Sequence, residues 1–209
     1  NPKPRRKPAD TGVRPEHSIA PNVLERDFSA PGPNQKWVAD FTYVSTWAGW
    51  VFVAFVIDAY ARRILGWRTA TSMTTELVLD AIEQAIWTRQ QDNRDQFDDL
   101  VAHNDRGVQY LSVAYGQRLA DAGITPSVGA VGSSYDNALA ETINGLYKAE
   151  LIHRRAPWKT VESLELATLE WVTWFNHQRL LEPIGYIPPA EAEDRYYLQL
   201  TVQADHACT

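Results

Sequence analysis

The chain has 209 residues, of which 44% are hydrophobic and 22% charged, a balance that excludes a disordered chain and allows one well-buried domain with extensions. The longest apolar run, residues 50–57, is much shorter than the roughly 20 residues of a membrane-spanning helix. The single cysteine, Cys208, excludes an internal disulfide. We therefore expect a soluble protein of a reducing, cytoplasmic compartment with no membrane partner.

The net charge of −6 argues against a nucleic-acid partner, because neutralising phosphates takes lysine and arginine. The charge is unevenly distributed, however. Residues 1–14 and 137–159 are locally basic, whereas acids concentrate in residues 76–99 and 162–194. A cationic face for DNA therefore stays compatible with the acidic total.

The first predicted elements follow a proline-rich arm. Residues 1–35 hold seven of the twelve prolines and predict an extended basic arm or linker. Residues 37–45 alternate aromatic and β-branched side chains, 50–57 form a continuous apolar run, and 64–70 read as a third strand. The short connections predict an antiparallel meander, because parallel neighbours need longer crossovers.

Helices and strands alternate in the rest of the chain. Apolar residues at helical spacing over 77–86 predict a helix with Ser72 or Thr74 as its cap. The further predicted elements are a strand at 100–103, a helix at 113–121 ended by Gly123, a strand at 124–128, a helix at 135–153 capped by Ser133 or Ser134 and interrupted by Pro157, and a last long helix at 161–178.

Three acids occupy positions in the predicted elements that suggest a functional role. Asp40 lies inside a strand pattern, where aspartate is disfavoured and a buried unpaired carboxylate is expensive. Asp105 follows the end of a second strand, and Glu141 lies two turns into a helix, with 35 residues between these two. Clustered, the three would repel each other unless divalent metal is bound, and Mg²⁺ prefers such oxygen ligands. Two ions would suit an in-line displacement at phosphorus.

Five segments, in this order, resemble the catalytic half of OrfB-type insertion-sequence transposases, which are related to retroviral integrases. The segments are PNQKWVADFTYV (33–44), VIDAYARRILGW (56–67), HNDRGVQY (103–110), SSYDNALAETINGLYKAEL (133–151) and FNHQRLLEPIGYIPPAE (175–191). The resemblance implies an α/β, RNase H-like fold with a five-stranded mixed sheet flanked by helices. It places this integrase-like core at 36–180 and a C-terminal extension at 181–209.

The same resemblance implies a DDE transposase core that cleaves DNA and transfers a 3′-hydroxyl to a new phosphodiester. Asp40, Asp105 and Glu141 would then be the catalytic acids and the ligands of two Mg²⁺ or Mn²⁺ ions. The implied partners are transposon-end and target DNA, with a homo-oligomer in the synaptic complex. The alternatives are an RNase H-like nuclease without strand transfer and a non-catalytic DNA-binding or oligomerisation module.

The helix that carries the third acid also predicts DNA contacts. Asn137, Asn144 and Lys148 share one stripe with that acid and would face the substrate together. In integrases, positions such as Asn137 and Lys148 contact the DNA end. Arg154 and Arg155 follow this helix and are either a solvated face or a phosphate-contacting patch.

Four further residues have a structural and a functional interpretation. Asp58 ends a strand, and we interpret it as an acid that caps a turn rather than as a catalytic group. His103 could reach a metal, but a histidine at a strand end is more often a hydrogen-bonded neighbour. Trp171 and Trp174 could stack on bases, although their helical spacing makes a core or interface role the first expectation.

Overall fold

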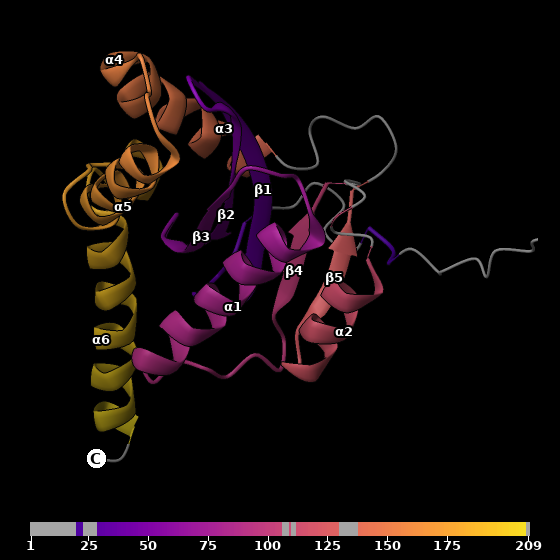
Figure 1. Cartoon of the computed structure of the whole chain (residues 1–209). Helices are drawn as coiled ribbons and strands as arrows, with labels where there is room; N and C mark the ends of the chain where they lie inside the picture. The colour runs from indigo at the N-terminus through magenta and orange to yellow at the C-terminus, as the bar shows by residue number, and fades with distance from the viewer. Residues whose placement is uncertain (1–19, 23–28, 106–108, 110–111, 130–137, 208–209) are drawn as a thin grey trace, which may run out of the picture.

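A computed structural model describes residues 20–22, 29–105, 109, 112–129 and 138–207. Within them, a five-stranded mixed sheet is covered by helices (Figure 1). The strand order across the sheet is β3-β2-β1-β4-β5. The strands are β1 (Lys36–Thr46), β2 (Gly49–Asp58), β3 (Ile64–Ala70), β4 (Val101–Asn104) and β5 (Thr125–Val128). This confirms the α/β fold class and the five strands predicted from the sequence.

The sheet combines an antiparallel and a parallel half. β1, β2 and β3 form the expected antiparallel meander, and β4 and β5 run parallel to β1. The turn between β1 and β2 uses Gly49, whose φ of 115° is a conformation that side chains other than glycine rarely adopt. The crossovers of the parallel half pass through helices, as parallel neighbours require.

Eight helical segments follow the meander in the described part of the chain. They are α1 (Thr75–Gln91), α2 (Val113–Asp121), α3 (Ala138–Tyr147), η2 (Lys148–Ile152), α4 (His153–Arg155), α5 (Val161–His177), η3 (Glu182–Ile184) and α6 (Pro189–Ala207). None of these helices is long and apolar enough to cross a lipid bilayer.

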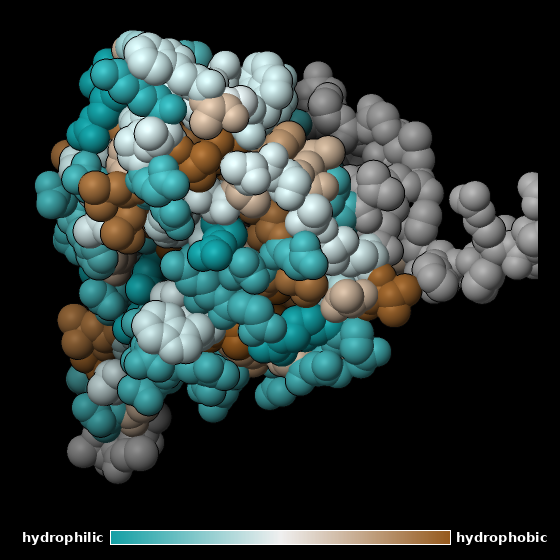
Figure 2. All heavy atoms as spheres, in the orientation of Figure 1, coloured by the Kyte–Doolittle hydropathy of each residue, from teal (hydrophilic) through white to brown (hydrophobic). Residues whose placement is uncertain are grey.

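Alternate residues of the strands feed two hydrophobic cores, one on each face of the sheet. Trp37, Ala54 and their neighbours pack with α1 and α2, whereas Phe55 packs with α3 and α5. α1 lies so close to the sheet that a Cβ at Gly66 would collide with the carbonyl oxygen of Ala81. The outward surfaces of α1 and α2 are largely hydrophilic, which completes an amphipathic cover (Figure 2).

The predicted helix at 135–153 differs from the structure in its second half. Its first residues and the proposed caps lie outside the described residues. α3 is followed by a π-helical segment, η2, and then by the short α4. A wider turn allows the successive residues Leu151 and Ile152 to be buried together. Apolar spacing alone does not reveal this change of helix type.

The prediction that 161–178 is the last long helix is wrong, because α6 follows it. α6 has few apolar residues on its buried side, and a charged residue of that side, Glu193, holds it against α1. Glu193 is fully buried and bonds the fully buried Arg89 near the end of α1, and Arg94 Nη1 lies 2.9 Å from the same carboxylate. Figure 1 shows α6 passing beside that end of α1. Hydrophobic periodicity does not predict a helix that is held mainly by ion pairs.

Candidate active site

Asp40 and Asp105 meet at one edge because their strands are parallel neighbours. Ala39 on β1 pairs with Asn104 on β4, and each acid is the next residue along its strand. Asp40 continues β1, whereas Asp105 begins the segment after β4. The parallel pairing of β1 with β4 therefore brings the backbone positions of Asp40 and Asp105 side by side.

Asp40 lies in an environment that opposes its ionisation. Its carboxylate accepts hydrogen bonds from the Phe41 backbone N–H and from Asn144 Nδ2, both at 2.8 Å. Burial nevertheless raises the pKa of Asp40 to about 6, and the negative charges of Asp105 and Glu141 add to the rise. Asp105 and Glu141 therefore both act electrostatically on Asp40, which is ionised only above weakly acidic pH.

The carboxylate oxygens of the three acids are suitable ligands for a divalent cation, but the carboxylates do not lie close enough together to share one. Asp105 and Glu141 are exposed, and Asp40 is partly buried. Carboxylate oxygens are hard ligands, and a cation among them would offset the repulsion that raises the pKa of Asp40. No set of three or more His, Cys, Asp or Glu side chains in the described ranges is already placed to hold one ion. Sharing an ion would therefore require the carboxylates to move closer together.

Of the residues predicted to share a helix face with Glu141, Asn144 is in contact with one of the acids. It lies on α3, is buried, and donates its amide hydrogen to Asp40 Oδ2. Its position thus fits an orienting role for Asp40, and contact with DNA stays a prediction. Asn137 lies outside the described residues.

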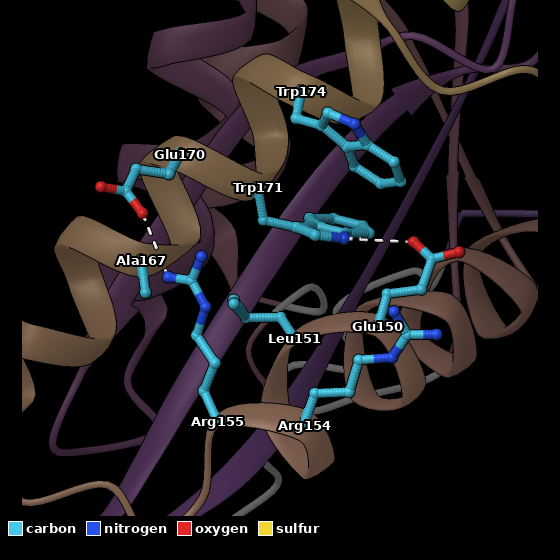
Figure 3. Close-up of a pocket in the computed structure, with 8 residues that line it drawn as sticks. All are labelled: Glu150, Leu151, Arg154, Arg155, Ala167, Glu170, Trp171 and Trp174. Carbon is cyan, nitrogen blue, oxygen red and sulfur yellow. Dashed lines mark hydrogen bonds and ion pairs between the residues drawn. The ribbon is translucent and has the colours of Figure 1, made fainter.

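The predicted basic residues separate into two places. Lys148 lies with Nζ 5.0 Å from the centre of the Tyr43 ring, at the edge of β1. Arg154 and Arg155 line a hollow of about 500 Å³ between the η2–α4 segment and α5, to which none of the three acids contributes (Figure 3). Arg155 Nη1 lies 3.1 Å from Glu170, so its charge is partly compensated.

Two tryptophans of α5, Trp171 and Trp174, line one side of this hollow. Trp171 is buried, and its indole N–H donates to Glu150 Oε2 at 3.2 Å. Trp174 lies above it and is partly exposed (Figure 3). The core interpretation is confirmed for Trp171.

The structural interpretations of Asp58 and His103 are also confirmed. Asp58 Oδ1 accepts the backbone N–H groups of Tyr60 and Ala61 at 2.9 and 3.3 Å, which caps the turn after β2. Burial raises the pKa of Asp58, and the guanidinium of Arg89 beside it opposes this rise. His103 is buried, with Nδ1 2.9 Å from Ser127 Oγ on β5.

Sequence analysis missed the exposed aromatic residues at the end of the β1–β2 hairpin. Tyr43, Trp47 and Trp50 are all more than half exposed. A signal was present, because a hairpin turn flanked by large aromatics cannot bury all of them. The alternation in this segment by itself indicates only a strand.

The arrangement of the sheet matches the catalytic cores of retroviral integrases. One match is a simian T-cell lymphotropic virus intasome structure, at a TM-score of 0.63 and 16% identity over 86% of this chain and 60% of that one. Another is the HTLV-2 integrase catalytic core domain, solved in complex with magnesium, at 0.61 and 17% identity over 79% of this chain and 99% of that one. These matches confirm the RNase H-like fold.

Sequence comparison assigns the family. A model of the integrase core domain matches residues 30–134, and a second model with the same description matches residues 122–189. The chain belongs to the integrase core domain family. The resemblance to insertion-sequence transposases seen in its motifs is confirmed by this assignment and by its relatives.

Two of those relatives are transposases of bacterial insertion sequences. The chain is 63% identical over 178 residues to a putative transposase for the element IS986/IS6110 of Mycobacterium tuberculosis, covering 85% of this chain and 64% of the relative. It is 52% identical over 196 residues to the IS629 transposase of Shigella sonnei, covering 94% of this chain and 64% of the relative. The chain thus spans less than two thirds of the length of these transposases.

Proposed function

We propose that this chain is the catalytic core of a DNA transposase, which cleaves DNA at a transposon end and joins the 3′-hydroxyl to a new phosphodiester. The observation that carries the proposal is Asp40 flanked by the charges of Asp105 and Glu141, in an integrase core that is 63% identical to a transposase. The DNA substrate would place its work in the bacterial cytoplasm. Pairing two transposon ends would call for at least two protomers.

The three acids would hold the metal. Asp40 and Asp105 would bind one Mg²⁺ or Mn²⁺ ion, and Asp40 with Glu141 a second. Bound metal supplies charge neutralisation at the attacking and leaving oxygens of the phosphodiester. A magnesium complex is known for the HTLV-2 integrase core, which shares this fold.

The protein's own groups would orient and bind the DNA. The backbone N–H of Phe41 and the amide of Asn144 fix both oxygens of Asp40, so that its charge is aimed before the substrate arrives. Asn137 and Lys148 would contact the DNA end. Arg154 and Arg155 would contact phosphates further along, where Arg154 has no ion pair with the described part of the chain.

A strand-transfer assay tests the proposal. Labelled transposon-end duplex is incubated with the protein and Mg²⁺ or Mn²⁺, beside Asp105→Asn and the control Asp194→Asn, which changes an exposed carboxylate on α6. We expect a joined product with the parent and the control, and loss of cleavage and joining with Asp105→Asn. An equally active Asp105→Asn would refute the site, and shortened strands without joined product would favour a nuclease.

A further inference from the structure

Three large aromatic side chains project from the end of the β1–β2 hairpin. Tyr43 is 55% exposed, Trp47 70% and Trp50 57%. The Tyr43 and Trp50 rings meet edge to face, with centroids 5.3 Å apart. Single exposed aromatics are common on protein surfaces, but neighbouring ones form a patch that calls for an explanation. We call these three side chains the hairpin rings.

The hairpin that carries these rings is held in place by the segment after α4. Thr46 forms a parallel bridge with Trp158, and the Trp47 backbone N–H donates to the Trp158 carbonyl at 2.9 Å. Trp158 is itself buried, and its indole N–H donates to the carbonyl of Ile152 at 3.2 Å. The contacts with Trp158 therefore hold the end of the hairpin in place. Figure 1 shows this end near α4.

Lysines are interleaved with the rings. Lys148 Nζ lies 5.0 Å from the centre of the Tyr43 ring, and Lys159 Nζ lies 5.3 Å from that of Trp47. A hollow of about 480 Å³ at this place is lined by all three rings together with Lys148 and His153, and its lining includes no aspartate or glutamate. In a chain with a net charge of −6, an acid-free and lysine-bearing hollow is complementary to an anion.

The hairpin rings are continuous with the candidate active site. Tyr43 lies three residues after Asp40 on β1. Asn144 on α3 bonds Asp40, and Lys148, one turn further along at the start of η2, lies with its Nζ 5.0 Å from the centre of the Tyr43 ring. A strand leaving the acids along this edge would therefore meet the lysine and then the rings.

We propose that the hairpin rings bind unpaired nucleotides of a DNA strand next to the site of cleavage. The bases stack on Tyr43, Trp47 and Trp50, and the phosphates lie near Lys148 and Lys159. Aromatic platforms in a cationic groove bind single strands in this way, and duplex DNA keeps its base faces covered. That the strand is DNA being transposed rests on the function proposed above. Capture of unpaired bases itself rests only on the rings and lysines.

Binding without catalysis tests this proposal. Fluorescence anisotropy measures the affinity for a labelled oligothymidylate and for a duplex of equal length, in EDTA so that no cleavage occurs. Trp50→Ala and Trp47→Ala are compared with Trp87→Ala, which removes a 58% exposed tryptophan from α1. We expect each hairpin variant to bind the single strand about fivefold or more weakly, with little change for the duplex. Trp87→Ala should match the parent.

The lysines give an independent readout. Lys159→Ala should lower the slope of log affinity against log salt by about 0.7 for the single strand. Thermal melting of every variant checks that the hairpin change leaves the fold intact. Equal affinity of Trp50→Ala and Trp87→Ala would overturn the proposal. So would equal weakening for single strand and duplex, or a changed oligomeric state with unchanged single-strand binding.

The test of single-strand binding by the hairpin rings can fail or succeed independently of the proposed transposase function. The binding measurement needs no metal and no reaction, so it reports on the rings whether or not the acids catalyse strand transfer. Failure of strand transfer together with ring-dependent binding would refute the transposase proposal alone. Ring-independent binding together with strand transfer would refute the hairpin proposal alone.

Discussion

Asp58 at the end of β2 and Asp40 within β1 are carboxylates of the same sheet with opposite surroundings. Asp58 is fully buried but lies 2.9 Å from the guanidinium of Arg89, which also bonds Glu193. Asp40 accepts hydrogen bonds from an amide and a backbone N–H, and its charged neighbours, Asp105 and Glu141, repel it. The charge of Asp58 is compensated by a buried arginine. Within the described residues, no cation pairs with Asp40, so it is the carboxylate suited to an added cation.

Breaking the compensated group should have the largest effect on stability. Glu193→Ala would remove one of the two buried carboxylates that bond Arg89 and would leave excess positive charge buried there, so we expect unfolding to become easier by about 3–5 kcal/mol. The neighbouring control Asp194→Ala removes a 71% exposed partner of Arg94 and should change stability by less than about 1 kcal/mol. Urea denaturation measures both. Similar losses for the two variants would show that the buried cluster does not anchor α6.

Asp40→Asn should act in the opposite direction when no metal is present. The pKa of Asp40 is raised from 3.8 to about 6, so the folded state binds the proton more tightly than the unfolded state. That stability contribution is fully present below pH 3.8 and is lost as the pH rises through about 6. Asparagine avoids the loss, and at pH 7 the variant should be more stable by at most about 3 kcal/mol.

Denaturation at pH 4 and pH 7 in EDTA measures this difference. Asp58→Asn is the matched control, because removing a compensated carboxylate leaves Arg89 unbalanced and should destabilise the fold. The contrast between the two groups would be refuted if both variants lost stability at pH 7.

A smaller effect is expected for the positioning residue Asn144. Its hydrogen bond lowers the pKa of Asp40, so Asn144→Ala should raise that pKa and move the acidic limb of the activity profile to higher pH. Activity should fall roughly 10- to 100-fold, as for groups that orient metal ligands. Asn176→Ala is the control, because the Asn176 amide bonds the backbone of Ile64 on β3, two strands away from β1 in the sheet. If the acidic limb of the pH–activity profile lay at the same pH in both variants, the role assigned to Asn144 would be contradicted.

Local patterns predicted most of the scaffold. Period-two alternation and apolar runs identified β1, β2 and β3, and helical spacing identified α1, α2 and α5. These elements are buried on defined faces, so their sequences carry the period of the structure. α6 carries no such pattern, because Glu193 anchors it to arginines that are distant in sequence.

The candidate site was predictable in composition and less so in geometry. Asp40 was conspicuous as an acid within a strand, and its meeting with Asp105 follows from the parallel pairing of β1 and β4. The bond from Asn144 to Asp40 depends on how α3 crosses the edge of β1, which spacing along the helix does not determine. The strand pattern does not reveal the hairpin rings, because the same aromatics favour a buried and an exposed strand; only their position around a tight turn indicates that some of them are exposed.

Metal-dependent thermal melting tests the central claim most directly. Mn²⁺ or Mg²⁺ is titrated at pH 7 into the parent, Asp105→Asn and the control Asp194→Asn, and the melting temperature is followed. Because a ligand that binds only the folded state stabilises it by mass action, the parent and the control should gain stability with rising metal concentration. Asp105→Asn should gain much less. Equal shifts in all three proteins would contradict a metal site built from Asp40, Asp105 and Glu141.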